Sequence, residues 1–422
     1  MCSHLQALKD FDPAIYNAII GEEKRQFNSV RLIPSENYVS DAVLDASGSI
    51  LTNKYSEGYA KKRYYEGQQY IDDIETLAIE RAKELFGAEH ANVQPYSGSP
   101  ANAAVFYALL EKGDKIMGLN LLEGGHLTHG WKSNMSARFY ESVPYHVDKD
   151  TEMLNYDAIA EQVKTEKPKL IIAGYTAYPR IIDFARFREI ADSVGAYLLA
   201  DISHINGLIV GGVHPNPVPY ADVVSSTSHK AIRGPRGGFI LSKKEYAKAI
   251  DSAIIPGLQG GPHNHTTAGI AVAFKEAMQP EFKQYATQVV ANAKHLADKL
   301  MEKGFVLVTG GTDNHLMVIN TIASHDVTGK VMSEAMAKAG IVSNYNMVPF
   351  DTRSPMDPSG VRLGTPAVTT RGFKEAEMDM IADWMHQVIL DPTNEDNLAR
   401  IHAEVEELCG KFPCPGIHPT DW

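Results

Sequence analysis

One lysine lies where an apolar segment turns polar, directly before a glycine-rich turn. The segment 223–230 reads Val-Val-Ser-Ser-Thr-Ser-His-Lys, and 234–238 follows as Gly-Pro-Arg-Gly-Gly. The apolar residues predict a strand, which places Lys230 at the strand's carboxyl end. A lysine in that position forms a Schiff base when burial or neighbouring charge lowers the pKa of its ammonium group. A solvated surface lysine is the alternative, but the flanking pattern favours a reactive amine.

An acidic residue ends a second apolar segment, upstream of this lysine. Asp201 closes the run Ala196–Asp201, and His204 follows three residues later. Pyridoxal phosphate requires a carboxylate against its pyridine nitrogen, so that the protonated ring accepts electrons. Asp201 meets that requirement if Lys230 carries the cofactor. Helix capping is the alternative role for an aspartate at this position.

A turn of small polar residues follows the predicted strand His90–Val93. Ser97, Gly98 and Ser99 precede Pro100, and this pattern predicts a helix with Ser99 as its N-cap. Free backbone N–H groups and the positive end of a helix dipole form a phosphate-binding site. The segment lacks the lysine of a nucleotide P-loop and the glycine spacing of a dinucleotide-binding turn.

Two histidines lie three residues apart in the segment Gly124–Gly130. His126 and His129, with Asp201, raise the question of a metal ion. Zinc sites have three or four protein ligands, and no familiar metalloenzyme spacing occurs in this sequence. We therefore predict no metal site, and instead an imidazole from His126 lying flat on the cofactor ring.

An arginine in the last third of the chain is a candidate for binding the substrate. Arg362 lies in the segment Ser-Gly-Val-Arg-Leu-Gly-Thr-Pro over 359–366. A guanidinium group binds the α-carboxylate of an amino acid through two parallel hydrogen bonds. A surface ion pair is the alternative role.

Alternating strands and helices must position these residues. Between about 77 and 277, helical segments separate the apolar strands Lys115–Leu119, Lys169–Gly174, Ala196–Asp201, Asp222–Ser225 and Gly238–Leu241. This alternation predicts a mainly parallel sheet covered on both faces, with ligands at the carboxyl ends of its strands. After Pro280, a long helical pattern, two apolar strands and further amphipathic helices predict a smaller α/β domain. We expect a helical arm over 1–30, a large domain over 31–280 and a small domain over 281–422.

The composition excludes several classes of protein. The 422 residues carry a formal charge of −12 at pH 7, which argues against a nucleic-acid partner because phosphate backbones are bound by clustered cations. Three cysteines are too few for a disulfide framework and suit a reducing cytoplasm. The sequence shows neither a signal-peptide pattern nor an apolar run of bilayer length, so we expect a cytoplasmic protein without a membrane partner.

Together these segments resemble the serine hydroxymethyltransferase family, whose members are pyridoxal-phosphate enzymes of fold type I. The resemblance covers nearly the whole chain. It implies an α/β fold with a mainly parallel seven-stranded sheet in the large domain and a smaller C-terminal α/β domain. The matching motifs are Arg31–Tyr38, Thr52–Tyr59, Lys62–Tyr65, Ser97–Asn102, Gly124–Gly130, Asp201 with His204, the lysine segment, Pro256–Pro262, Thr312–His315 and the Arg362 segment.

The resemblance also implies the roles of individual residues. Lys230 holds pyridoxal 5'-phosphate, Asp201 pairs with the pyridine nitrogen, and His126 stacks on the ring. A homodimer with an active site across its interface is implied as well, and a pairing of dimers into tetramers stays open. The other implied cofactor residues are Ser97, Gly98, Ser99, Thr176, His204, Thr227 and His229, with Tyr55 and Gly261 from the partner; the substrate residues are Ser35 and Arg362, with Glu57 and Tyr65 from the partner handling the hydroxyl proton.

Two functions remain open within this family resemblance. The first is transfer from L-serine to tetrahydrofolate through a glycyl quinonoid, which yields glycine and methylene-tetrahydrofolate. The second is a folate-independent L-threonine transaldolase, in which a second aldehyde is the acceptor. The sequence departs from the family pattern at Glu66, Tyr345 and Met347, near the place where the family binds folate. Candidate residues for folate or another second substrate are Leu121, Gly125, Leu127 and Asn346.

Overall fold

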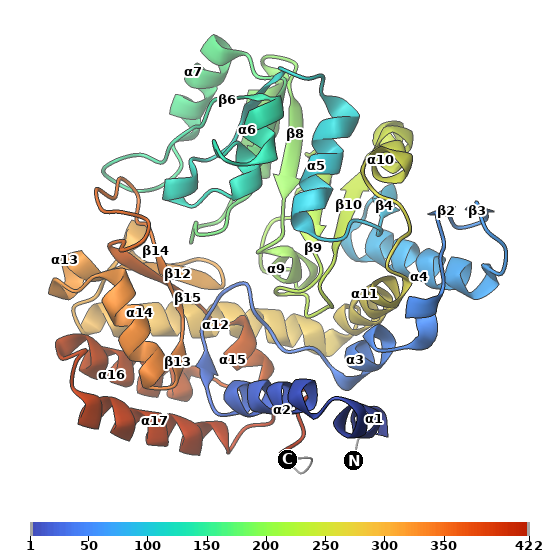
Figure 1. The fold of residues 1–422 in the computed structure, drawn as a ribbon. Coiled ribbons are helices and arrows are strands. Elements are labelled where there is room, and N and C mark those ends of the chain that lie inside the picture. Colours follow the sequence, from blue (N-terminus) through green and yellow to red (C-terminus); the bar gives the residue numbers. More distant parts are fainter. Residues whose placement is uncertain (1–2, 420–422) are drawn as a thin grey trace.

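The computed structural model describes residues 3–419, which form two lobes joined by one long helix (Figure 1). We call the seven-stranded sheet with its helices the large lobe, and the four-stranded sheet with its helices the small lobe. The large lobe contains β4 (His90–Asn92), β5 (Lys115–Met117), β6 (Glu141–Ser142), β7 (Leu170–Ala173), β8 (Tyr197–Asp201), β9 (Val223–Thr227) and β10 (Gly238–Ser242), with α4 (Gln69–Phe86), α5 (Gly98–Leu109), α6 (Met135–Phe139), α7 (Tyr156–Glu166), α8 (Phe184–Asp192), α9 (Asn206–Val210), α10 (Ala247–Ser252) and α11 (Asn264–Ala277).

The strand order of the large sheet is β4-β10-β9-β8-β7-β5-β6. Strand β10 runs antiparallel to both β4 and β9, while the pairs from β9 to β6 are parallel. Every residue of β7 and β9 is buried, as expected for strands covered by helices on both faces. The predicted mainly parallel sheet is therefore confirmed. The short edge strand β6 was absent from our predicted strands.

The small lobe has a four-stranded sheet in the order β11-β12-β15-β14. Its antiparallel pairs place Arg362 of β15 directly between Val318 of β12 and Asn344 of β14. Its elements are β11 (Val306–Leu307), β12 (Leu316–Asn320), β13 (Ile341–Val342), β14 (Asn344–Asn346) and β15 (Gly360–Gly364), with α12 (Pro280–Glu302), α13 (Thr321–His325), α14 (Gly329–Lys338), α15 (Pro366–Thr370), α16 (Glu375–Leu390) and α17 (Glu395–Cys409).

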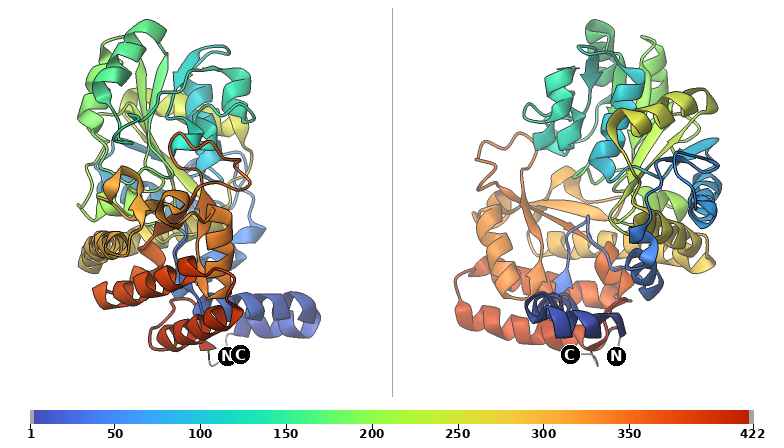
Figure 2. Two further views of the ribbon diagram at one scale, coloured as in Figure 1. Left: turned by 90° about the vertical axis from the view of Figure 1, so that its left-hand side faces the viewer. Right: turned by 45° about the vertical axis from the view of Figure 1, so that its right-hand side comes forward.

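The N-terminal segment spans both lobes. Helices α1 (Ser3–Phe11) and α2 (Pro13–Phe27) form an arm that projects from the small-lobe half of the molecule (Figure 2). Strand β1 (Val30–Arg31) then pairs in parallel with β13. Next come α3 (Asp41–Ser47), which packs on α11, and the hairpin of β2 (Gly58–Tyr59) and β3 (Lys62–Arg63).

Helix α12 takes part in two hydrophobic cores. Its first half contributes Phe282 and Val289 to the core of the large lobe, whereas Ala293 and Leu296 belong to the core of the small lobe. Val30 and Leu32, from the N-terminal segment, also lie in the small-lobe core. The domain limits at 31 and 281 therefore stay a prediction. None of the helices within residues 3–419 combines the length and apolar character that a bilayer-spanning helix requires.

Candidate functional site

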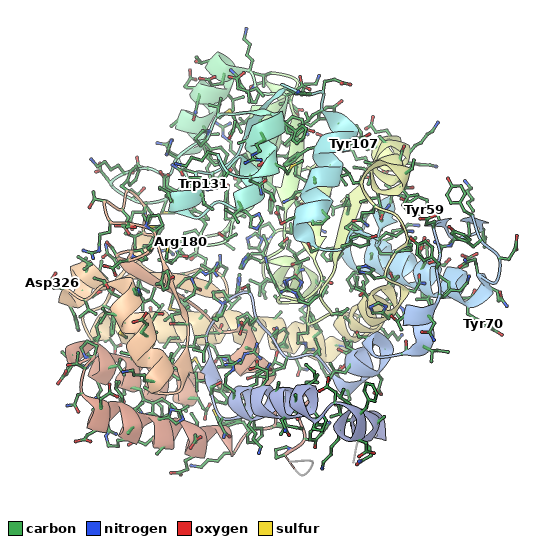
Figure 3. All side chains as sticks on the ribbon, in the orientation of Figure 1. Tyr59, Tyr70, Tyr107, Trp131, Arg180 and Asp326 are labelled. Carbon is green, nitrogen blue, oxygen red and sulfur yellow. The ribbon has the colours of Figure 1, made fainter. Side chains whose placement is uncertain are left out.

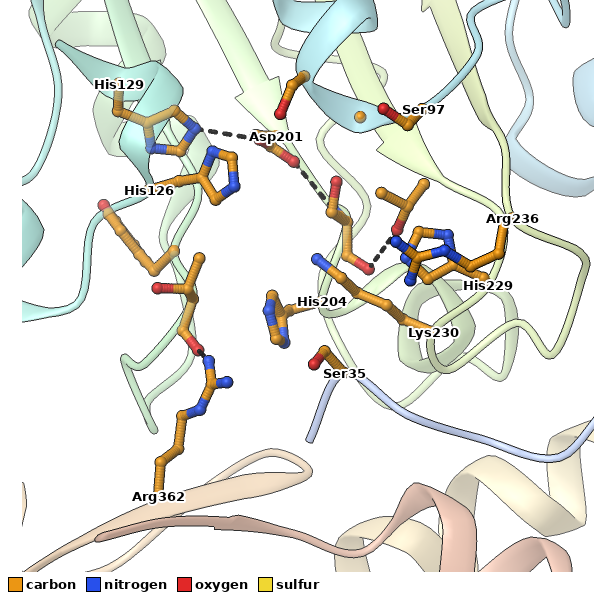
Figure 4. Close-up of a pocket in the computed structure, with 16 residues that line it drawn as sticks. Ser35, Ser97, His126, His129, Asp201, His204, His229, Lys230, Arg236 and Arg362 are labelled. Carbon is orange, nitrogen blue, oxygen red and sulfur yellow. Dashed lines mark hydrogen bonds and ion pairs between the residues drawn. The ribbon is translucent and has the colours of Figure 1, made fainter. Parts of the chain in front are cut away.

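A cavity of about 320 Å³ opens at the carboxyl ends of the central strands (Figure 4). Thr176 follows β7, Asp201 ends β8 and Thr227 ends β9, so three neighbouring strands deliver polar groups to its wall. A Cβ atom on Gly174 would lie 2.1 Å from the carbonyl oxygen of Asp201, so only glycine allows β7 to end this close to β8. Arg362 of the small lobe closes the cavity from the opposite side. The site therefore lies between the two lobes.

The Asp201 carboxylate is buried, lines the cavity and takes part in three hydrogen bonds. Its Oδ2 atom accepts hydrogen bonds from Asn102 Nδ2 at 2.9 Å and pairs with His129 Nε2 at 3.0 Å. Its Oδ1 atom accepts the backbone N–H of Ser203 at 3.1 Å. Burial by itself raises the pKa of Asp201, but the bond to His129, electrostatic interactions with His129 and His126, and the bond to Asn102 outweigh it and hold the pKa well below its usual range. Asp201 is thus a permanent anion on the cavity wall.

His126, His129 and Asp201 bring three possible metal-ligand atoms within 4.8 Å of one another. Two of these atoms, His129 Nε2 and Asp201 Oδ2, are hydrogen-bonded to each other at 3.0 Å. His126 itself is held by a hydrogen bond of 2.7 Å between its Nδ1 and the hydroxyl of Thr128. Burial and the neighbouring charges of His129 and Lys230 lower the pKa of His126 to about 4 against the opposing effect of Asp201. A neutral imidazole therefore faces the cavity beside the Asp201 anion.

Lys230 is 9% exposed, and its ammonium group points into the cavity (Figure 4). Its Nζ atom forms no ion pair with any described residue. Burial lowers the pKa of Lys230 to about 8; Asp201 opposes this effect, whereas Arg362 and Arg236 add to it. About a tenth of this amine is therefore neutral and nucleophilic at pH 7, far more than for a lysine with the ordinary pKa.

The N-terminus of α5 lies at one corner of the cavity, where a helix dipole and free backbone N–H groups favour an anion. The helix begins at Gly98 with Ser97 as its N-cap residue, so the prediction of Ser99 as the N-cap was wrong by two positions. The Ser97 side chain makes no capping bond and is free to face a ligand. A Cβ atom on Gly98 would lie 2.7 Å from Cγ2 of Thr227, which leaves no room there for a side chain. Arg236 adds a cation to the same cavity.

Two stacked histidines extend from the cavity into the protein. The rings of His204 and His315 lie 5.6 Å apart, with His204 Nδ1 at 3.4 Å from His315 Nε2. Burial lowers the pKa of His204 well below its usual value and that of His315 to about 3, with Lys230 and Arg362 adding to both shifts. Both rings are therefore neutral. Only His204 of this pair lines the cavity, together with His229 on another wall.

The Arg362 guanidinium group is held by neutral acceptors alone. Its Nη1 donates to the backbone oxygen of Thr176 at 2.7 Å, and its Nε to Oδ1 of Asn344 at 3.2 Å. Burial lowers the pKa of Arg362 to about 10, which still leaves it charged at neutral pH. No carboxylate within the described residues pairs with it. This charge is therefore available for an anionic ligand, and Ser35 lines the same cavity.

Four further predicted site residues lie outside this cavity, in a separate group. The hydroxyl of Tyr65 donates to Glu57 Oε2 at 3.2 Å, and the rings of Tyr55 and Tyr65 lie 5.6 Å apart. A Cβ atom on Gly261 would lie 3.0 Å from the Tyr55 ring. Tyr55 is 57% exposed and Tyr65 46% exposed. Glu57 directly precedes the hairpin β2–β3, whose Tyr59 is labelled near one edge of the molecule in Figure 3.

The candidate residues for a second substrate also lie outside the cavity walls. Leu127 is 48% exposed, while Leu121 is half-buried. Gly125 is packed so tightly that a Cβ atom would lie 2.0 Å from the backbone oxygen of Leu119, and its own carbonyl accepts a hydrogen bond from Thr176. Asn346 lies on the edge strand β14. Their assignment remains a prediction.

Sequence reasoning did not assign the observed roles of four residues, and it did not name Tyr175 and Ser203, which also line the cavity. Asn102 and His129 hold Asp201, Arg236 lines the cavity, and His315 stacks on His204. Arg236 carried a signal, because it follows the reactive lysine within a glycine-rich turn. The other three contact their partners over 72 to 111 positions of sequence, and no local pattern announces such contacts.

The residues of the cavity fit pyridoxal phosphate. An amine that is partly neutral, an ionised carboxylate and a helix N-terminus without side-chain obstruction all face one cavity of suitable size. On a mainly parallel sheet covered by helices, these groups define a pyridoxal-phosphate-dependent enzyme of fold type I.

Comparison with known proteins identifies the family within this class. The sequence model described as serine hydroxymethyltransferase matches residues 8–385. Relatives named serine hydroxymethyltransferase include those of Acidothermus cellulolyticus (58% identical, covering 98% of both chains), Desulfotalea psychrophila (58%, covering 98% of this chain and 97% of the relative) and Sorangium cellulosum (57%, with the same coverage). The chain belongs to the serine hydroxymethyltransferase family, and the resemblance found in the sequence is confirmed.

Proposed function

We propose that this chain transfers the hydroxymethyl group of L-serine to tetrahydrofolate, which yields glycine and methylene-tetrahydrofolate. The observation that carries the proposal is the convergence of Lys230, Asp201 and Arg362 on one cavity. This set provides an attachment point, an electron-sink partner and a carboxylate receptor, which an enzyme acting on amino acids requires. None of the three relatives is named a transaldolase, and no contact in the cavity favours that alternative.

Each residue of the cavity has a proposed role that follows from the charge of its side chain. The Lys230 amine attaches the cofactor, and Asp201 keeps a proton on its pyridine nitrogen. Bound pyridoxal phosphate withdraws electrons from the substrate α-carbon, which weakens the bond to the hydroxymethyl carbon. Arg362 and Ser35 hold the substrate carboxylate. The remaining cofactor contacts are assigned to Ser97, Gly98, Ser99, His126, Thr176, His204, Thr227 and His229.

A second copy of this chain completes the site in our proposal. Glu57 and Tyr65 form a hydrogen-bonded acid–base pair that stands apart from the cavity of their own chain. The charge of Glu57 and the bond to it raise the pKa of Tyr65, so the phenol keeps its proton at neutral pH. In a homodimer this pair would exchange a proton with the substrate hydroxyl, and Tyr55 and Gly261 would reach the cofactor phosphate. A tetramer of two such dimers is compatible with this arrangement.

The proposal also covers the cellular location and the domain organisation of the protein. A reducing cytoplasm suits Cys409 and Cys414, which are both buried free thiols. We keep a helical arm over 1–30, a large domain over 31–280 and a small domain over 281–422 as the proposed organisation. Tetrahydrofolate, which accepts the hydroxymethyl group, would contact Leu121, Gly125, Leu127 and Asn346.

Product analysis tests the proposed reaction. The holoenzyme is incubated with L-serine, with and without tetrahydrofolate, and glycine is measured by chromatography. We expect glycine formation to depend on tetrahydrofolate and to be matched by methylene-tetrahydrofolate. Folate-independent release of acetaldehyde from L-threonine, with the glycyl unit added to a second aldehyde to form a new amino acid, would instead establish the transaldolase.

A further inference from the structure

The side-chain amide of Asn37 uses its whole hydrogen-bonding capacity. Its Nδ2 donates to the backbone oxygen of Lys230 at 3.2 Å and to the hydroxyl of Tyr285 at 2.9 Å. Its Oδ1 accepts the hydroxyl of Thr370 at 2.7 Å and the backbone N–H of Tyr38 at 2.9 Å. An amide offers two donors and two acceptor sites, so each one is occupied. Asn37 therefore has one fixed orientation.

Two of these bonds lead to the turn that carries the lysine. The backbone oxygen of Lys230 accepts from Arg233 N at 3.0 Å, within the turn, and from Asn37, outside it. The next carbonyl, that of Ala231, accepts the Tyr285 hydroxyl at 3.3 Å. The backbone carbonyls of Lys230 and Ala231 thus both accept hydrogen bonds from side chains that lie outside the turn. Their position sets where the Lys230 Cα atom lies.

The same network connects the lysine turn to the carboxylate-binding elements. Asn37 follows Ser35 by two residues, and Ser35 lines the cavity. Thr370 ends α15, which begins two residues after the strand that bears Arg362. Tyr285 lies on α12, the helix shared by both hydrophobic cores. One amide therefore joins the large-lobe lysine turn to the N-terminal segment and to the small lobe.

We propose that Asn37 is a positioning residue, which holds the turn of Lys230 in a fixed place relative to Ser35 and Arg362. The cofactor is attached on the large lobe, while Arg362 of the small lobe receives the substrate carboxylate. Reaction at the α-carbon requires the cofactor and Arg362 to lie at a fixed position relative to each other. Misplacement by about 1 Å lowers the rate on the order of a hundredfold. Asn37 maintains that relative position without touching the reacting atoms. This inference rests on the proposed attachment of the cofactor to Lys230.

Hydrogen–deuterium exchange of the holoenzyme tests the positioning role directly. The amides of Arg233 and Gly234 donate to Lys230 O at 3.0 Å and to Ser228 O at 2.7 Å, so their exchange reports the stability of the turn. The variant Asn37→Asp keeps the shape but lacks both donors. We expect faster exchange at 233–234 and a fall in kcat on the order of tenfold to a hundredfold, with a smaller change in KM for L-serine. Thr370→Val, which removes one bond to Oδ1, should produce the same changes to a smaller extent.

Asn28→Ala is the matched control. The Asn28 side chain joins the N-terminal segment to α17 through Glu406 Oε1 at 3.3 Å and has no contact with the lysine turn. We expect it to leave exchange at 233–234 and kcat unchanged. Wild-type exchange and kcat in both Asn37→Asp and Thr370→Val would overturn the proposal, even if the melting temperature falls. Borohydride reduction of the wild-type holoenzyme, followed by peptide mass analysis, tests separately whether the cofactor is attached to Lys230.

Discussion

The Nε2 atom of His129 lies 3.0 Å from the Oδ2 atom of Asp201, and both side chains are buried. A buried carboxylate without partners would take up a proton, because burial disfavours its charged form. The imidazole of His129 and the amide of Asn102 reverse that preference, and the carboxylate stays ionised. One wall of the cavity therefore carries a fixed negative charge.

This relationship predicts how stability depends on pH. The pKa of Asp201 is lower in the folded chain than in the unfolded chain, where it is about 3.9. Its contribution to stability is therefore fully present above the unfolded value and is lost as the pH falls toward the folded value. We expect the free energy of unfolding of the cofactor-free chain, measured in urea, to fall more steeply below pH ~4 for the wild type than for Asp201→Asn. Parallel curves for the two proteins would contradict the assignment.

A second pH dependence concerns the amine of Lys230. Because its pKa is lowered to about 8, its neutral fraction rises with pH through that value. We expect the rate at which trinitrobenzenesulfonate modifies Lys230 in the cofactor-free chain, followed by peptide mass analysis, to rise over the same range. Arg236→Gln removes a nearby cation and should move this profile to higher pH, whereas Arg400→Gln, at an exposed pair with Glu404, should not. A profile like that of exposed lysines, centred near pH ~10.4, would refute the lowered pKa.

Replacement of the cavity arginine should weaken substrate binding. Lysine at position 362 keeps the charge but cannot form two parallel hydrogen bonds with a carboxylate. A hydrogen bond to a charged group contributes ~1.5–3 kcal/mol, so Arg362→Lys should raise KM for L-serine by about tenfold or more. Arg180→Lys, at an ion pair with Asp313 outside the cavity, serves as the control in steady-state kinetics. Equal KM values for the two variants would argue against carboxylate binding by Arg362.

Hybrid dimers can reveal whether the active site crosses a subunit interface. Lys230→Ala and Glu57→Gln each remove one half of the proposed site, and each protein alone should be nearly inactive. In a dimer of one chain of each kind, one site contains an intact lysine and an intact glutamate. Subunit exchange of equal amounts should restore up to about a quarter of the wild-type activity. Failure to regain activity, although mass spectrometry shows hybrid dimers, would place Glu57 in the site of its own chain.

Several elements were predictable because their signals are local. The apolar runs that became β7, β8 and β10 stand out along the chain, as does the helical spacing of α12. Lys230, Asp201 and Arg362 were predictable because each follows or lies in a strand with a distinctive flanking pattern. The helix start at Gly98 was misjudged, since the Ser-Gly-Ser turn offers two serines with similar capping preference.

The sequence by itself determined the fold type and the family and predicted a reactive amine at Lys230, because strand periodicity and ordered motifs are properties of neighbouring residues. Only the tertiary structure decided which distant side chains bond to the site residues and thereby fix their charge and position. His129 reaches Asp201 across 72 positions, and Asn37 reaches Lys230 across 193. The tertiary structure also places Glu57 and Tyr65 outside the cavity that Lys230 lines. Contacts of this kind depend on how packed lobes bring distant segments together, which local propensity does not specify.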